Sequence, residues 1–126
     1  RTMKQVIATT AAPGAIGPYS QAIDTGTFVY ASGQIPINPA TGEIPQGITA
    51  QTEQSLANVK AIMEAAGLTM ANVVKTTVFL ADMADFGAMN EVYARAFEAP
   101  YPARSAVAVR ELPKGVMVEI EVLAMR

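Results

Sequence analysis

Apolar residues recur at every second position in several short stretches of the chain. Residues 4–9 and 27–33 are rich in β-branched or aromatic side chains, which predicts one strand in each segment. A third strand is predicted within 71–82, where alternate side chains share one face: Val74, Thr76, Val78 and Leu80.

Two more strands are predicted near the end of the chain, at 104–110 and 116–124. In the second of these strands, Val116, Val118, Ile120 and Val122 share one face. They alternate with Met117, Glu119, Glu121 and Leu123 on the other face. The segment ELPKG between the two strands suits a hairpin connection.

Two segments have helical spacing instead. Within 49–66 the apolar positions lie three and four apart, at Leu56, Val59, Ile62, Met63 and Ala66, and Gly67 follows as the expected helix stop. Near 84–98 one face carries Phe86, Met89, Tyr93 and Phe97, and Pro100 ends the helix.

The order of these elements is strand, strand, helix, strand, helix, strand, strand. It predicts an α+β domain over residues 1–126, with an antiparallel or mixed sheet and both helices on one face. Gly/Pro-rich loops separate the elements, and Arg1 and Thr2, ahead of Met3, are expected to be vector-derived.

Composition points to association between copies. Only 16% of the 126 residues are charged, against about 25% in an average soluble domain. A sheet face without helices is then the expected oligomer interface. The net charge of −2 argues against a nucleic-acid partner, and no apolar run reaches membrane-spanning length, so a cytoplasmic protein is expected.

The chain contains no cysteine and no histidine. Thiol nucleophiles, disulfides and Ser-His triads are therefore excluded, and a zinc or copper site is not expected. Any catalysis must use carboxylates, Lys, Arg, Tyr, hydroxyls or backbone groups.

Arg104 stands at the start of a predicted strand, after a proline-bounded turn. A guanidinium keeps its charge, so its burial requires an anion or hydrogen-bond acceptors. The partner is either Glu119 or Glu121 in a structural ion pair, or a substrate carboxylate bound bidentately. The sequence does not fix the strand register, so both alternatives stay open.

Glu119 and Glu121 share one face of a strand whose other positions are apolar. They are either solvated at an edge or placed for chemistry, since a shielded carboxylate has a raised pKa and can act as a general acid or base.

The remaining candidates are weaker. Tyr19 follows a Gly-Pro turn, where it lines a pocket or packs in the turn. Ser32 and Gly33 end a strand, where backbone N–H groups can receive an anion. Asn90 lies on the second predicted helix, where a position in a binding site and a position in solvent are equally plausible. The glycines lack the spacing of a phosphate loop, so nucleotide binding is not expected.

Taken together, these segments resemble the RidA (YjgF-type) family of reactive intermediate deaminases. The segment PARSAVAVRELPKGVMVEIEV (102–122) is similar to the family signature and keeps Pro102, Arg104, Ser105, Leu112, Pro113, Val116 and Glu119 at its spacing. GPYSQA, ASGQIP…TGEI, QTEQSLANVKAIMEAAG and VVKTTVFLADMADFGAMNEVY match in the same order, so the resemblance covers about residues 4–125.

The resemblance implies a chorismate-mutase-like α+β fold and a homotrimer with sites in clefts between subunits. It implies hydrolysis of 2-iminobutanoate and 2-iminopropanoate to 2-oxoacids and ammonia, with no cofactor and no metal. Carried over by position, Arg104 would bind the substrate carboxylate and Glu119 would position the water and manage protons. The pocket would be lined by Tyr19, Ser32, Gly33, Asn90 and Ala106.

At Ala106 the chain departs from many deaminating members, which have cysteine after the Arg-Ser pair. If this position contributes its backbone carbonyl to the water, alanine can do the same as cysteine. If the cysteine thiol itself contributes, alanine cannot replace it. The main alternative to catalysis is a trimer that only binds small carboxylates such as 2-oxoacids. RNA cleavage is not expected, because the chain is acidic and has no histidine.

Overall fold

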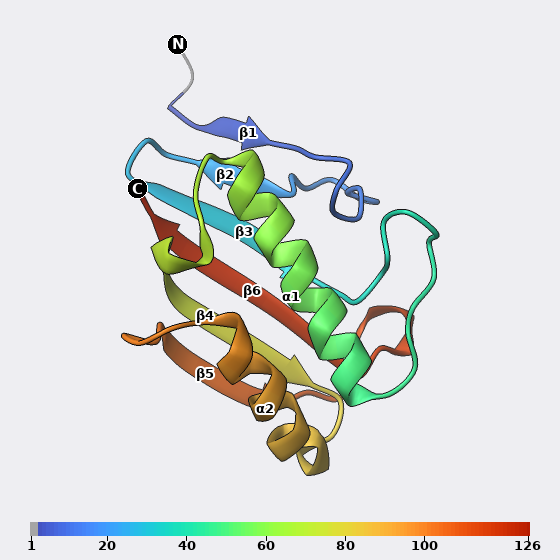
Figure 1. Ribbon diagram of the computed structural model, residues 1–126. Coiled ribbons are helices and arrows are strands. Elements are labelled where there is room, and N and C mark those ends of the chain that lie inside the picture. Colours follow the sequence, from blue (N-terminus) through green and yellow to red (C-terminus); the bar gives the residue numbers. More distant parts are fainter. Residues whose placement is uncertain (1–2) are drawn as a thin grey trace.

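The six strands form one mixed sheet, and both long helices lie on the same face of it (Figure 1). The computed structural model describes residues 3–126, so Arg1 and Thr2 lie outside the described residues. The strand order is β1-β2-β3-β6-β4-β5, and only β4 and β5 run parallel. The elements are β1 Gln5–Ile7, β2 Ala22–Asp24, β3 Phe28–Gln34, α1 Ile48–Ala65, η1 Met70–Asn72, β4 Val73–Leu80, η2 Met83–Asp85, α2 Phe86–Ala96, β5 Ala103–Ala108, η3 Pro113–Gly115 and β6 Val118–Met125.

The core lies between the helices and the sheet. The apolar stripe predicted for α1 is buried, and so is the alternating apolar set predicted for β6. The first helix ends at the predicted glycine, because Gly67 adopts φ +77°, which favours a residue without a side chain. The predicted mixed sheet with both helices on one face is confirmed.

Two strands differ in detail from the sequence prediction, and one connection differs outright. The strand β2 was not predicted, since three residues give too short a pattern to recognise. Val74 does not share the buried face of β4, because the pairing with β6 shifts between Val73 and Lys75 and turns Val73 inward instead.

The predicted hairpin between the last two strands is wrong. β6 inserts between β3 and β4, whereas β5 pairs with the far edge of β4. The segment β4–α2–β5 is therefore a parallel crossover unit, and the ELPKG segment carries the chain across β4 to the middle of the sheet. This connection decides which face each candidate residue occupies.

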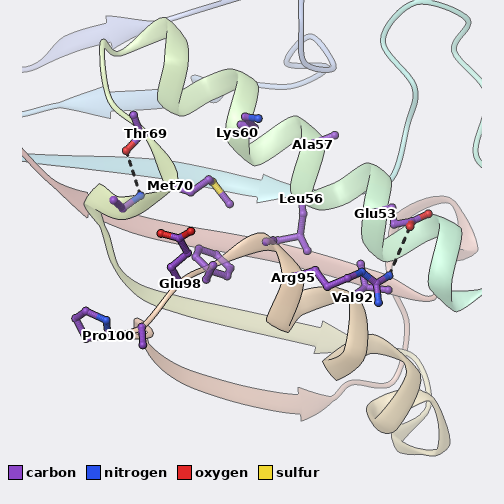
Figure 2. A pocket seen from close by; sticks show the side chains of 14 residues that line it. Glu53, Leu56, Ala57, Lys60, Thr69, Met70, Val92, Arg95, Glu98 and Pro100 are labelled. Atoms are coloured by element: carbon purple, nitrogen blue, oxygen red, sulfur yellow. Dashed lines mark hydrogen bonds and ion pairs between the residues drawn. The ribbon is translucent and has the colours of Figure 1, made fainter.

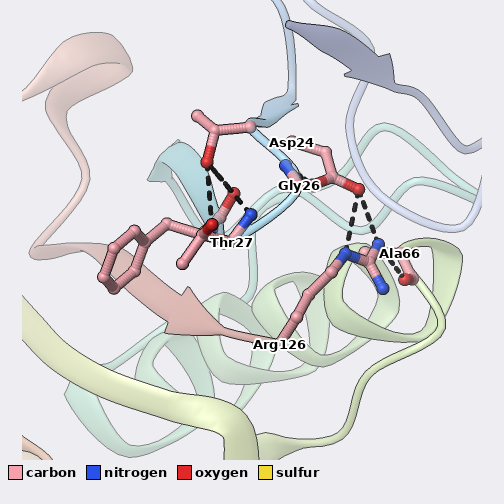
Figure 3. A network of polar contacts seen from close by, with 7 residues as sticks. Asp24, Gly26, Thr27, Ala66 and Arg126 are labelled. Atoms are coloured by element: carbon pink, nitrogen blue, oxygen red, sulfur yellow. Dashed lines mark hydrogen bonds and ion pairs between the residues drawn. The ribbon is translucent and has the colours of Figure 1, made fainter. Parts of the chain in front are cut away.

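The C-terminal residue ties distant parts of the chain together (Figure 3). Arg126 donates from Nη2 to Asp24 Oδ2 at 2.6 Å and from Nε to the same oxygen at 3.1 Å. Nη2 also donates to the Ala66 carbonyl at the end of α1, at 2.6 Å. The guanidinium thus links the end of β2 to a helix C-terminus, where a cation is favoured.

None of the helices in residues 3–126 is long and apolar enough to cross a membrane.

Candidate functional site

Arg104 lies on β5 and points to the helix-covered side of the sheet. Its Cα pairs with that of Thr76, whose side chain is fully buried beneath the helices. Its Nη1 donates to Asn90 Oδ1 at 2.6 Å, and its guanidinium carbon lies 4.8 Å from the Tyr93 ring centroid and 5.4 Å from that of Phe86. No carboxylate among residues 3–126 lies within ion-pair distance of it. The other N–H donors of this partly buried cation remain available for an anion.

Glu119 lies on β6 and points to the opposite side of the sheet. It pairs with Phe79, three positions along β4 from Thr76. Because side chains alternate along a strand, an odd separation places Arg104 and Glu119 on opposite faces. Glu121 lies on the same face as Glu119. Neither glutamate therefore forms an ion pair with Arg104 of the same chain.

The Glu119 carboxyl rests against the backbone of Gly33. A Cβ at position 33 would lie 2.9 Å from the Glu119 carboxyl carbon and closer still to its Oε2, so the approach requires a glycine. Burial raises the pKa of Glu119, and the like charge of Glu121 raises it further. No N–H or hydroxyl among the described residues donates to this carboxylate, which leaves it free to take a proton.

Ser32 connects this position to the loop that carries Tyr19. Its hydroxyl donates to the Ser20 carbonyl at 2.6 Å, and its backbone N–H donates to the Gln21 carbonyl at 2.9 Å. Tyr19 is 49% exposed and lines a pocket of about 470 Å³ with residues of the same loop. The buried Gln21 side chain donates to the Pro13 carbonyl at 2.7 Å and accepts from the Thr9 N–H at 2.7 Å, which holds the loop in place.

The predicted residues therefore form two groups. Arg104, Asn90 and Ala106 lie together on the helix-covered side, since Ala106 is two positions from Arg104 on β5. The second group lies at β3 and β6 and in the adjoining loop, and comprises Tyr19, Ser32, Gly33 and Glu119. One small ligand cannot touch both groups in one chain, because the sheet lies between Arg104 and Glu119.

A cavity of about 700 Å³ lies elsewhere, between α1 and the end of α2 (Figure 2). Its rim carries an ion pair of 3.8 Å between Arg95 and Glu53, and its floor includes Leu56, Val92 and Phe97. These floor side chains are at most 5% exposed. None of the predicted site residues lines it. Among residues 3–126, no group of three or more Asp and Glu side chains is placed to hold a metal ion.

Sequence reasoning assigned Phe86 and Tyr93 only to the core face of a helix and missed their contact with Arg104. The available signal was the spacing of Phe86, Asn90 and Tyr93, which places all three on one side of α2. That spacing does not reveal which strand the helix covers.

Comparison with known proteins gives consistent matches over nearly the whole chain. A family model described as Endoribonuclease L-PSP (Ribonuc_L-PSP) matches residues 9–126. A RutC family protein of Haemophilus influenzae is 58% identical over 128 residues, covering 98% of each chain. The 2-iminobutanoate/2-iminopropanoate deaminase of Escherichia coli K12 is 54% identical over 127 residues, covering 98% of this chain and 99% of the relative.

Solved structures agree with these matches. The crystal structure of E. coli TdcF with bound serine superposes with a TM-score of 0.95 at 52% identity, covering 97% of this chain and 98% of that one. The yjgF gene product of E. coli superposes with a TM-score of 0.94 at 54% identity, with the same coverage.

Proposed function

This chain belongs to the RidA (YjgF-type) family, which the Ribonuc_L-PSP model describes, and we propose that it is a deaminase of small 2-iminoacids. It hydrolyses 2-iminobutanoate and 2-iminopropanoate to the 2-oxoacids and ammonia. Such imines are reactive, and their hydrolysis limits damage to other molecules. The observation that carries the proposal is Arg104, an arginine without an ionic partner whose free N–H groups suit a carboxylate.

The site is assembled between copies of the chain. Arg104 and Glu119 lie on opposite faces of one sheet, so an arrangement that brings them to one ligand requires Glu119 from a neighbouring subunit. The sheet face without helices supports this arrangement, since it exposes large apolar side chains such as Tyr30, Val107 and Met125. In a homotrimer with cyclic symmetry, three equal sites form in this way.

The proposed reaction needs no histidine, thiol or metal. Arg104 holds the substrate carboxylate, and Glu119 takes a proton from a water molecule as the oxygen attacks the imine carbon. The protonated imine is already electrophilic, and its nitrogen accepts the C=N electron pair. Glu119 then returns the proton to the amino group of the resulting carbinolamine. Glu119 takes the hydroxyl proton as the C–N bond breaks and the C=O bond forms, which releases the 2-oxoacid and ammonia. The ammonia then takes this proton from Glu119 and leaves as ammonium ion, so the carboxylate is restored.

Two features of Glu119 support its role as the base. Its raised pKa makes it a stronger base than an ordinary glutamate, and its carboxylate has no donor among the described residues. Ala106 supplies only backbone groups at the position where many relatives have cysteine. The proposal therefore assigns no step to a thiol.

The test is an imine-trapping assay. Threonine dehydratase generates 2-iminobutanoate in the presence of semicarbazide, with the purified protein added or withheld. We expect the protein to lower semicarbazone formation and Arg104→Ala to have no effect on it. Unchanged trapping with the unsubstituted protein would refute the proposal.

The alternative is a trimer that binds small carboxylates without turnover. The structure of TdcF with bound serine favours considering it, because serine carries a carboxylate and is not an imine. This alternative requires Arg104 but not Glu119. Retention of 2-oxobutanoate binding without any imine hydrolysis would support it.

The endoribonuclease description of the family model suggests RNA as a substrate. The net charge of −2 and the absence of histidine argue against it, because RNA binding needs a basic surface and nucleases commonly use histidine for proton transfer.

A further inference from the structure

One side of α2 is built around the Arg104 guanidinium. Phe86, Asn90 and Tyr93 are spaced four and three residues apart, which places them in a row along the helix. All three contact the guanidinium: Asn90 accepts a hydrogen bond of 2.6 Å, and the two rings lie 5.4 and 4.8 Å from its central carbon.

The guanidinium lies over two rings whose residues are seven positions apart on α2, about two turns of the helix. The faces of both rings attract a cation within about 6 Å. Asn90 lies between the rings in sequence and restricts rotation of the guanidinium about its long axis.

The two rings are not held equally. Tyr93 is anchored, because its hydroxyl shares a hydrogen bond of 2.7 Å with Thr76 and its ring packs 4.8 Å from that of Phe97. Phe86 stands at the start of α2 and is only partly buried. Both rings therefore pack against the core as well as the arginine, and Phe86 is the less buried of the two.

We propose that Phe86 and Tyr93 are positioning residues that fix the plane of the Arg104 guanidinium, so that the N–H groups of its free edge donate to both oxygens of a carboxylate. This inference rests on the proposed function, because it deepens how that site recognises its substrate. Bidentate binding requires the guanidinium to be coplanar with the ligand, and a rotating side chain satisfies this only part of the time.

The first test needs no ligand. In the unliganded protein, the Arg104 Nε–H signal in NMR should show a ring-current shift and a high order parameter. In Phe86→Leu the order parameter should fall and the part of the shift that comes from Phe86 should be lost, while the part from Tyr93 remains. Both should be retained in Phe86→Tyr, which keeps a ring. An Nε–H as mobile in the unsubstituted protein as in Phe86→Leu would overturn the proposal.

The second test separates positioning from folding. Titration calorimetry with 2-oxobutanoate should show an affinity about three- to thirtyfold lower for Phe86→Leu. Leucine keeps an apolar side chain against the core, so the melting temperature should fall by less than in a variant that truncates a buried residue of α2. Val92→Ala truncates a buried side chain of α2 and leaves Phe86, Asn90 and Tyr93 in place, so it should lower the melting temperature and leave the affinity near that of the unsubstituted protein. Light scattering verifies that all variants have the same assembly.

Equal affinity of Phe86→Leu and the unsubstituted protein would overturn the positioning role. If the unsubstituted protein binds no 2-oxobutanoate, the proposed function and the positioning role both fail, while the NMR result still decides whether the rings fix the guanidinium. If 2-oxobutanoate binds but no imine is hydrolysed, only the catalytic part of the proposed function fails, and the two affinities still decide the role of Phe86.

Discussion

Replacing Gly33 with alanine adds one methyl group directly against the Glu119 carboxyl. The new Cβ would lie 2.9 Å from the Glu119 carboxyl carbon and 3.1 Å from its Cγ, where ordinary contacts begin at 3.4 Å. The carboxyl carbon must therefore retreat by about 0.5 Å, and Oε2 must move further. Misplacement of a reacting group by about 1 Å can lower a rate about a hundredfold.

We expect Gly33→Ala to lower imine hydrolysis by about ten- to a hundredfold in the trapping assay. The free energy of unfolding should change by no more than about 1 kcal/mol, because the Glu119 side chain can rotate away from the methyl group. Gly87→Ala is the matched control, since nothing lies within 4 Å of its added Cβ. Alanine also suits the helix better than glycine at that position.

Combining Gly33→Ala with Glu119→Gln tests whether the alanine acts through Glu119. If Gly33→Ala acts by displacing Glu119, adding it to Glu119→Gln should cause little further loss of rate. Full activity of folded, correctly assembled Gly33→Ala would refute the reasoning, because Glu119 would then not need the position that the structure gives it.

Four further predictions concern charged groups. Arg104→Ala should lower the affinity for 2-oxobutanoate about a hundredfold or more in calorimetry and abolish hydrolysis, with the trimer mass unchanged in light scattering. The rate of the unsubstituted protein should fall as pH drops through the raised pKa of Glu119, because the base becomes protonated. Since that raised pKa means that ionised Glu119 opposes folding, Glu119→Gln should melt at a higher temperature at neutral pH. This gain should shrink as the pH drops through the raised pKa and vanish below the ordinary pKa of glutamate in the unfolded chain. Arg126→Ala should lower the melting temperature at neutral pH, and its cost should shrink as acid protonates Asp24, whose pKa the Arg126 hydrogen bond lowers. A pH-independent cost would contradict the role of this pair.

Most elements of the fold were predictable because their hydrophobic periods are clear. The apolar stripe of α1 is compatible only with a helix, and the alternation in β6 only with a strand. Gly67 marks the end of the helix. The strand β2 was missed because it has only three residues, and Val74 was misplaced because a register shift leaves no trace in composition.

The pairing of β5 could not be predicted, since ELPKG suits a hairpin as a local sequence. The alternative, in which β5 extends the sheet beyond β4, depends on how α2 packs over both strands. Without that pairing the faces of Arg104 and Glu119 are undetermined, because a shift of one residue exchanges them. The approach of Glu119 to Gly33 joins residues far apart in sequence and emerges only from the fold.

The central claim is that Arg104 and Glu119 of different subunits form one site, and subunit complementation tests it most directly. Under this account the Arg104→Ala chain is inactive alone and the Glu119→Gln chain keeps only a small residual rate. The two chains are co-expressed with different tags or mixed by refolding. In a randomly mixed trimer population, about a quarter of sites should pair an intact Arg104 with an intact Glu119 from its neighbour. We predict recovery of about that fraction of the activity per site. No recovery in verified mixed trimers of an otherwise active protein would contradict the shared site.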